Sequence, residues 1–207
     1  MNRLPPKPYA HVRPPILRWL FRCPLAALTS HWTFQGLLAM DPTERRFKLG
    51  LDLALAVALR PLLGRLPVAW LAALLLAHSL NLLLNGHPWA VLKTYRLVAL
   101  PPARRQRYLA GLARRVQAEP SLRLAAVYGS HARGELGACS DVDLRLVRRP
   151  GRRHGWRACC FLLRERTRAL LACIPLDAYL LDSEAALGRL RSDERPLLLS
   201  TAREDGQ

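Results

Sequence analysis

Hydrophobic positions are distributed unevenly along this chain, and their pattern changes at about residue 102. Long apolar runs with few charges lie before this point, whereas short apolar segments alternate with charged ones after it. Residues 103–207 carry 20 of the 32 basic residues and 12 of the 15 acidic residues. Two such regimes predict two structural units, a mostly helical hydrophobic region at 1–102 and a second domain at 103–207.

The first region contains the pattern of a helical hairpin at about residues 42–86. Asp41 is expected to cap the first helix, and Glu44 to complete a reciprocal capping pattern. That helix should end at about residue 60, because a proline and a glycine within 61–64 mark a turn. A second apolar segment follows at once, at residues 66–86.

This second segment has the composition of a membrane-spanning helix. It contains no Asp, Glu, Lys or Arg, and it meets the length of about 20 apolar residues that such a helix needs. Basic residues are abundant on both sides of the hairpin, while its loop holds Arg60 and Arg65, which would place both ends in the cytosol. We therefore expect a membrane-associated protein whose second domain lies in the cytosol. The competing interpretation is a soluble hairpin buried against the C-terminal half.

Three polar residues interrupt the second apolar segment at helical spacing. His78, Asn81 and Asn85 are three and four positions apart, so they fall on one face of a helix. A polar stripe of this kind must face protein or a water-filled cavity when the surroundings are apolar. We predict hydrogen bonds from this stripe to the preceding helix, with Asp52 as the partner. A polar substrate or headgroup site is the alternative.

The second region alternates between helix and strand patterns with short connections, which predicts one α/β (α+β) layer structure. The expected elements are a helix at 103–118, strands at 122–129 and 141–147, a helix at 154–173, a strand at 174–181, a short helix near 183–190 and a last strand at 195–200.

Candidate chemistry is concentrated between the first two of these strands. Gly129 lets the chain turn sharply and approach a phosphate, and Ser130 adds a hydroxyl donor. Asp141 and Asp143 are two positions apart on a strand, so both carboxylates point the same way. Carboxylate oxygens suit Mg²⁺, which completes its coordination with water and substrate phosphates.

The stretch VYGSHARGELGACSDVDLRLV resembles the minimal nucleotidyltransferase group of the DNA-polymerase-β-like superfamily. The shared pattern is a strand, a Gly-Ser turn, a short helix and an Asp-x-Asp on the next strand, and the resemblance covers about residues 103–207. It implies a polymerase-β-like fold preceded by the hydrophobic helical region. It also implies one or two Mg²⁺ ions and a nucleoside triphosphate as substrate.

The resemblance also implies a third carboxylate on a neighbouring strand, which would help to bind metal and activate the acceptor hydroxyl. Asp177 fits this role, since it interrupts an apolar strand. Asp182 is the rival, although its position at the strand end favours a helix cap. Arg133, after the Gly-Ser turn, either contacts the triphosphate or anchors the short helix.

The charge of the chain bears on its partners. The formal net charge is +17, and an excess of this size favours nucleotide phosphates, nucleic acid or an anionic membrane face. No helix-turn-helix, zinc or stacking-aromatic pattern is recognisable, so nucleic acid is not an expected partner. Five cysteines without a C-x-x-C pair indicate reduced thiols rather than disulfides or zinc.

The function expected from the sequence is transfer of a nucleoside monophosphate from a nucleoside triphosphate, with ATP as the expected donor. The acceptor hydroxyl would belong to a lipid-linked precursor, a protein or a small molecule at the cytosolic membrane face. Two alternatives stay open. One is a catalytically inactive, membrane-tethered module that binds nucleotide or protein, and the other is an antitoxin-like partner of a helical toxin.

Overall fold

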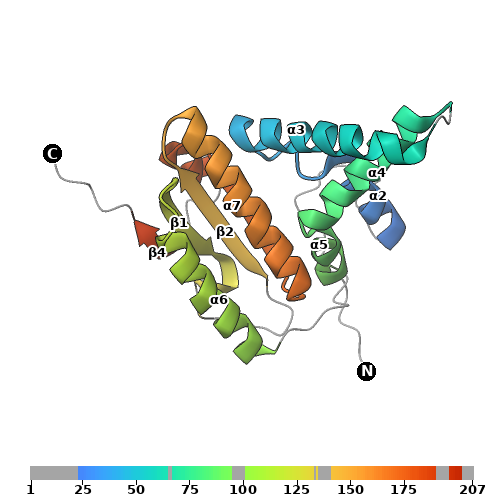
Figure 1. The fold of residues 1–207 in the computed structure, drawn as a ribbon. Helices are drawn as coiled ribbons and strands as arrows, with labels where there is room; N and C mark the ends of the chain where they lie inside the picture. Colours follow the sequence, from blue (N-terminus) through green and yellow to red (C-terminus); the bar gives the residue numbers. More distant parts are fainter. Residues whose placement is uncertain are drawn as a thin grey trace, which may run out of the picture.

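The chain folds into an α+β structure in which two helices of the second half lie on one face of a mixed sheet and the helices of the first half lie to one side of it (Figure 1). The computed structural model describes residues 23–64, 67–94, 101–132, 134, 141–189 and 196–201. In the first half the elements are α2 (Pro24–Phe34), α3 (Pro42–Leu59), the 3₁₀ helix η1 (Arg60–Leu63), α4 (Ala69–Leu84) and α5 (His87–Thr94). In the second half they are α6 (Pro102–Gln117), β1 (Leu122–Tyr128), η2 (Gly129–His131), β2 (Val142–Arg148), α7 (Arg152–Leu171), β3 (Leu176–Leu181), η3 (Glu184–Arg189) and β4 (Leu197–Thr201).

The helices and strands agree closely with those expected from the sequence. The first helix of the hairpin begins at Pro42, whose fixed φ suits the first helical turn, and it ends before Pro61. Gly64 then turns the chain with a φ of +61°. Each of the seven elements expected after residue 102 is present, with ends shifted by a few residues at most.

The four strands form a sheet of order β3-β2-β1-β4. β1 pairs antiparallel with β2 and with β4, whereas β2 pairs in parallel with β3. A parallel pair needs a crossover, and the 20-residue helix α7 supplies it. β3 forms one edge of the sheet and contacts α3 and α5 of the first half.

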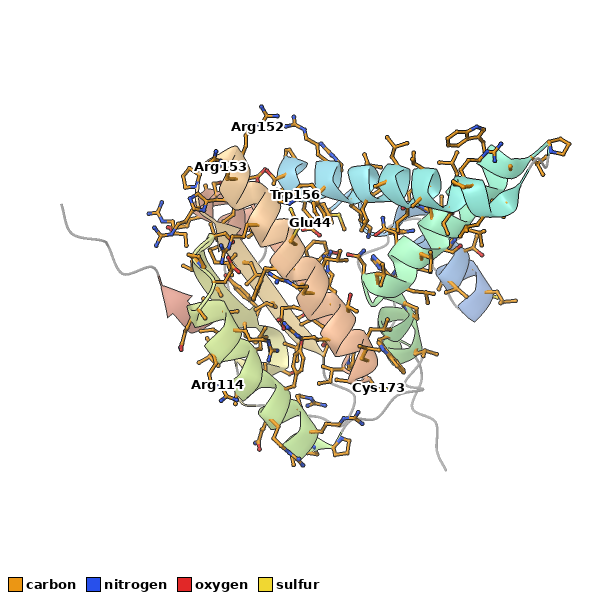
Figure 2. The ribbon with its side chains drawn as sticks, in the orientation of Figure 1. Glu44, Arg114, Arg152, Arg153, Trp156 and Cys173 are labelled. Atoms are coloured by element: carbon orange, nitrogen blue, oxygen red, sulfur yellow. The ribbon has the colours of Figure 1, made fainter. Side chains whose placement is uncertain are left out.

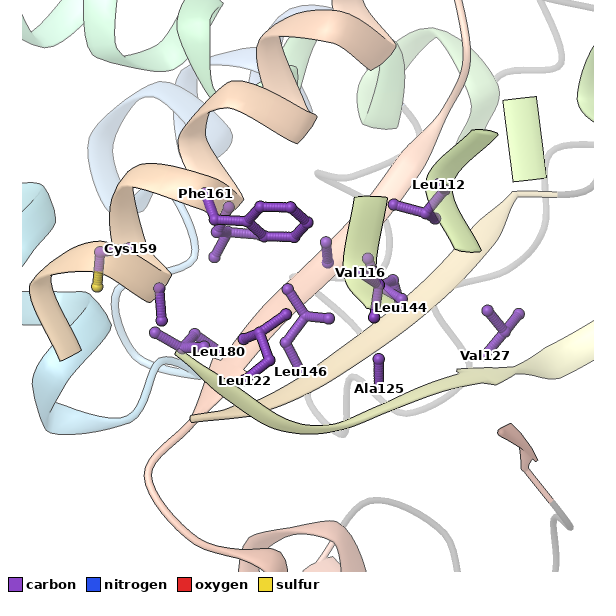
Figure 3. Packing of buried hydrophobic residues seen from close by; sticks show 13 residues of the cluster. Leu112, Val116, Leu122, Ala125, Val127, Leu144, Leu146, Cys159, Phe161 and Leu180 are labelled. Atoms are coloured by element: carbon purple, nitrogen blue, oxygen red, sulfur yellow. The ribbon is translucent and has the colours of Figure 1, made fainter. Parts of the chain in front are cut away.

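The main core lies between the sheet and the two helices that cover one of its faces (Figure 3). Alternate residues of β1 and β2 point into it, and the apolar face expected on 103–118 supplies its other side. The buried residues of this core include Leu112 and Val116 from α6, Ala158, Phe161 and Leu162 from α7, and Ala125, Val127, Leu144, Leu146 and Leu180 from the strands.

The opposite face of the sheet is divided in two. At one end Val147 and Leu181 pack beneath Ala186 of η3, so this end is a small second core. At the other end the same face presents Asp143 and Asp177. The strand alternation thus places the candidate site on the face that α6 and α7 leave uncovered.

Side chains of the first half and of α7 close the outer edge of β3. Leu180 N donates a hydrogen bond to Glu44 (2.7 Å), and Asp182 N donates to Asp41 (2.8 Å). The carbonyl of Ala178, on the same edge, accepts a hydrogen bond from Arg166. An edge strand with unpaired backbone groups is an aggregation site, so these three bonds both satisfy the edge and protect it.

Glu44 and Arg166 also form a buried ion pair with each other. The distance between Arg166 Nη2 and Glu44 Oε1 is 2.7 Å. The Arg166 side chain is 7% exposed and the Glu44 side chain is 3% exposed. Arg166 donates a further bond to Asn85 at the end of α4 (2.8 Å). A buried ion pair is tolerated only when its remaining donors and acceptors are satisfied, and here α3, α4, α7 and β3 supply the partners together.

The capping roles expected for three acidic residues are wrong. The carboxylate of Asp41 makes no capping bond to α3, and Glu44 binds Arg166 and β3 instead of the helix start. Asp182 accepts a bond from Arg148 (2.7 Å) and one from Thr43 N (3.2 Å). All three residues therefore hold the helix start against the sheet rather than capping helices locally.

The transmembrane helix expected from the apolar segment 66–86 is also wrong. Among the described residues, no helix combines the length and the apolar composition needed to cross a membrane. Within that segment the helix is α4, which has 16 residues. Its partner α3 has 18 residues but carries Glu44, Lys48 and Asp52.

The polar stripe on α4 contacts α3 as predicted. His78 Nδ1 lies 2.9 Å from one carboxylate oxygen of Asp52, and Asn81 donates to the other oxygen at 2.7 Å. One turn later, Asn85 donates to the side chain of Asn81 (2.6 Å). The prediction of hydrogen bonds between the two helices is confirmed.

Replacing Glu44 by Gln should destabilise the protein strongly, because it leaves the Arg166 charge buried without its counter-ion. We expect a loss of about 3–5 kcal/mol in the free energy of unfolding, measured by urea denaturation. The matched control is Glu184→Gln, which breaks an exposed pair with Arg123 whose side chains are 47% and 57% exposed. That variant should lose less than about 1 kcal/mol. Equal losses in the two variants would contradict the central role of the buried pair.

Candidate functional site

The Gly129-Ser130 turn continues directly from the end of β1. Gly129 has a φ of +75°, a conformation that other residues rarely adopt. A Cβ on Gly129 would also lie 2.3 Å from a carboxylate oxygen of Asp143, so a side chain at this position would force that carboxylate to shift. The turn therefore lies against this carboxylate, and its conformation favours glycine.

The strand register brings this turn and two carboxylates into one row. Tyr128, the last residue of β1, is opposite Asp143 on β2, and Asp143 is opposite Asp177 on β3. Neighbouring strands are about 4.8 Å apart, and aligned residues point to the same face. Asp143 and Asp177, separated by 34 positions in the sequence, are consequently neighbours on the sheet.

Asp141 joins this group from the start of β2. It precedes the strand by one residue and Asp143 by two, so backbone alternation directs both side chains to the same face. The next residue, Val142, donates its N–H to Pro175 O (3.0 Å), which fixes the start of β2 against β3. Both carboxylates are half-buried. The structure thus brings Gly129, Asp143 and Asp177 together, with Asp141 two residues before Asp143.

The carboxylate of Asp177 is paired with Arg145 of β2. The distance from Arg145 Nη2 to Asp177 Oδ2 is 3.1 Å, and Arg145 Nη1 donates to the backbone carbonyl of Asp177 (3.0 Å). The guanidinium also lies over the ring of Tyr179, 4.9 Å from its centroid. Burial, with a smaller contribution from the Asp177 charge, raises the pKa of Tyr179 to about 12. The Asp177 side chain is 42% exposed, so one side of it stays accessible.

Arg145 is a residue of the site that the sequence interpretation missed. The available signal was its position two residues after Asp143, which continues the Asp-x-Asp alternation on the same face of β2. A strand reading D-x-D-x-R places an arginine beside the carboxylates, where it can pair with one of them.

The first half of the chain also borders the site. Burial lowers the pKa of His31 on α2, and the charge of the Asp177 carboxylate opposes this shift only in part. The turn after α2 reaches the same place, since a Cβ on Gly36 would be 3.4 Å from the hydroxyl of Tyr179. The edge of the site next to β3 is therefore bordered by α2 and the turn that follows it.

The three-carboxylate metal centre expected from the sequence is not seen among the described residues. No group of three His, Cys, Asp or Glu side chains within the described part of the chain is arranged to hold a metal ion. Asp177, the expected third ligand, is bound to Arg145 instead. Asp141 and Asp143 still share a face, which suits a Mg²⁺ ion that enters with a triphosphate. Arg133 lies outside the described residues.

Comparison with known proteins does not identify the chain. No protein-family model matches it, and no curated protein matches its sequence. The functional argument therefore depends on the residues of the site and on their arrangement.

A second cluster of ionisable residues lies where α2, α3 and α5 meet. Lys48 donates to Gln35 O (2.7 Å), and its Nζ lies 2.8 Å from His87 Nε2. Burial, with a smaller contribution from the Arg166 charge, lowers the pKa of Lys48 to about 7, although Glu44 and Asp52 oppose the shift. Burial lowers the pKa of His87 well below its usual range, so the neutral ring can accept the bond from Lys48.

The adjoining cavity, lined by Glu44, Lys48, Asn85 and Arg166 among others, has a volume of about 10 Å³. This volume holds at most one water molecule. The Lys48 cluster is therefore a packed structural connection and not a ligand site.

Replacing Gly129 by Ala should displace the Asp143 carboxylate, because the added Cβ and this carboxylate cannot occupy the same space. We expect the free energy of unfolding to fall by roughly 1–3 kcal/mol, measured by urea denaturation. Gly134→Ala is the matched control, since Gly134 has a φ of +72°, close to that of Gly129, but a Cβ there would have no neighbouring atom within 4 Å. Its loss should reflect backbone strain alone and be smaller.

Lys48 should make stability depend on pH. Its pKa of about 7 in the folded protein is below the ordinary 10.5, so between these values the unfolded chain binds more protons and stability rises with pH. The free energy of unfolding of wild type minus that of Lys48→Met should therefore increase from pH 7 to pH 9, by up to about 1.4 kcal/mol per pH unit. For Arg114→Met, on the exposed side of α6, the difference should be constant. A constant difference for Lys48→Met would refute the lowered pKa.

Proposed function

We propose that this chain is a nucleotidyltransferase, which transfers a nucleoside monophosphate from a nucleoside triphosphate to an acceptor hydroxyl, with ATP as the expected donor. The observation that carries the proposal is the contact between the Gly129 turn and Asp143. It joins a turn suited to phosphate with a carboxylate pair suited to Mg²⁺. A polymerase-β-like fold for residues 103–207 is part of the proposal, and the order of strand, Gly-Ser turn, strand, helix and strand supports it.

In this proposal the turn and the carboxylates bind the donor. Gly129 and Ser130 contribute a backbone N–H group and a hydroxyl to the phosphate oxygens, and Arg133 contacts the triphosphate. Asp141 and Asp143 would hold Mg²⁺ entering with the triphosphate, and the ion would supply neutralisation of phosphate charge.

The transfer itself is an in-line displacement at the α-phosphorus. The acceptor oxygen forms a bond to the α-phosphorus. At the same time the bond from the α-phosphorus to the oxygen that bridges the α- and β-phosphates breaks. Pyrophosphate leaves with the electron pair, and Asp177 accepts the proton of the acceptor hydroxyl. Arg145 positions the Asp177 carboxylate through the 3.1 Å ion pair and leaves part of it accessible to the acceptor.

Label transfer tests this activity directly. The purified protein is incubated with Mg²⁺, each α-³²P-labelled nucleoside triphosphate and a cell extract as the source of acceptors. Asp141→Asn/Asp143→Asn should lower transfer at least about a hundredfold, because charge stabilisation at such a site contributes several kcal/mol to the transition state. Glu184→Gln, which removes an exposed carboxylate on η3, should transfer label as the wild type does.

Two outcomes would overturn the proposal. Tight nucleotide binding in equilibrium dialysis without transfer from any donor would assign a non-catalytic nucleotide-binding module, for which the ion pair of Asp177 with Arg145 is the supporting observation. Absence of both nucleotide binding and label transfer would exclude any function of this chain that uses nucleotides.

A further inference from the structure

Helix α3 turns its charged residues toward the protein and its apolar residues outward. Glu44, Lys48 and Asp52 recur every four residues and face the protein, where each has a polar partner. The residues that face outward beyond the first turn are apolar. A helix on a water-exposed surface normally has the reverse arrangement.

The outward residues form a continuous apolar ridge, which we define as Leu49, Leu53 and Val57. Their side chains are 50%, 60% and 53% exposed, and the spacing of four places them on one line along α3. Gly50, Ala54 and Ala58 are exposed beside them, so no charged residue interrupts the ridge. A large contiguous apolar surface of this kind marks an interaction site.

A basic groove lies at the end of the ridge where α3 and α7 begin. It has a volume of about 510 Å³, and its lining includes Arg46, Arg152 and Trp156. Trp156 is 66% exposed and stacks edge-on against Phe47 at a centroid distance of 5.0 Å. Figure 2 shows Arg152, Arg153 and Trp156 together at the start of α7, next to the first turns of α3.

A tryptophan and an arginine also lie at the other end of the hairpin. The guanidinium of Arg60 is 5.6 Å from the centroid of the Trp70 ring, and Trp70 is 55% exposed. Tryptophan and arginine are enriched where apolar and aqueous phases meet, because their side chains combine an apolar body with a polar tip. The apolar ridge therefore has residues of the interfacial type at both of its ends.

We propose that the apolar ridge and the basic groove form a docking surface for an anionic lipid bilayer. The ridge would lie in the outer part of the acyl region of one leaflet, and Arg46, Arg152 and Trp156 would contact the lipid headgroups. Such docking requires no membrane-spanning helix. It is also independent of the transferase activity proposed above, since none of these residues belongs to the carboxylate site.

The charge of the protein favours a bilayer over a second copy of the chain as the partner of this surface. The protein carries a net charge of +17, and the groove beside the ridge is lined by arginines. Pairing two copies through the ridge would bring like charges together without any compensating carboxylate in the groove lining, whereas anionic headgroups complement them.

Vesicle flotation tests the docking surface. Full-length protein is mixed with vesicles of phosphatidylcholine alone or with 30% phosphatidylserine. The wild type should float with the anionic vesicles, and its affinity should fall at high salt. Leu53→Glu should reduce binding at least tenfold, and Arg46→Gln/Arg152→Gln should reduce it roughly thirtyfold on anionic vesicles. Fluorescence of Trp156, isolated by comparison with Trp156→Phe, should shift to the blue on binding.

Matched variants keep this test specific. Leu171→Glu changes a 77% exposed leucine at the far end of α7, and Arg107→Gln/Arg114→Gln removes two exposed arginines from α6. Both should bind as the wild type does, and circular dichroism should be unchanged in all variants. The proposal would be overturned if the wild-type protein floats with neither vesicle type, or if Leu53→Glu binds anionic vesicles as the wild type does. A dimer that Leu53→Glu dissociates, with no flotation, would assign the ridge to a second copy instead.

Discussion

The buried ion pair of Glu44 with Arg166 is the interaction on which the arrangement of this molecule depends. Arg166 reaches from α7 across the edge of the sheet, and Glu44 reaches the same edge from α3. Both charges are buried, so each is stable only while the other elements are in place. The pair thereby makes the helices of the first half a structural requirement for the sheet of the second half.

The same interaction extends to the candidate site through one aromatic ring. Two guanidinium groups approach the ring of Tyr179. That of Arg166 is 6.0 Å from the ring centroid, and that of Arg145 is 4.9 Å from it. Arg145 in turn holds the Asp177 carboxylate. The position of a candidate catalytic carboxylate is thus set by contacts that begin at the start of α3, far from the Gly-Ser turn in the sequence.

Local signals in the sequence were sufficient to predict the helices and strands, because proline, glycine and apolar spacing act within a few residues. They were insufficient for Asp41 and Glu44, since a capping pattern and a long-range partner use the same residue types. The apolar run at 66–86 suggested a membrane span because hydropathy counts residues and does not register where a helix begins, here at Ala69. The contact of Gly129 with Asp143 follows from two consecutive strands, but the position of Asp177 depends on a register that no local pattern specifies.

The closing of the β3 edge has a consequence for how the protein is made. The bonds from Arg166, Leu180 and Asp182 to α3 and the residue before it span 122, 136 and 141 residues of sequence. During synthesis the hairpin leaves the ribosome before β3 has been made. In that interval Glu44 has no counter-ion, and the apolar ridge is exposed on a helix that has not yet packed against α7 and β3. The first half can therefore reach its final contacts only after α7 and β3 have been synthesised.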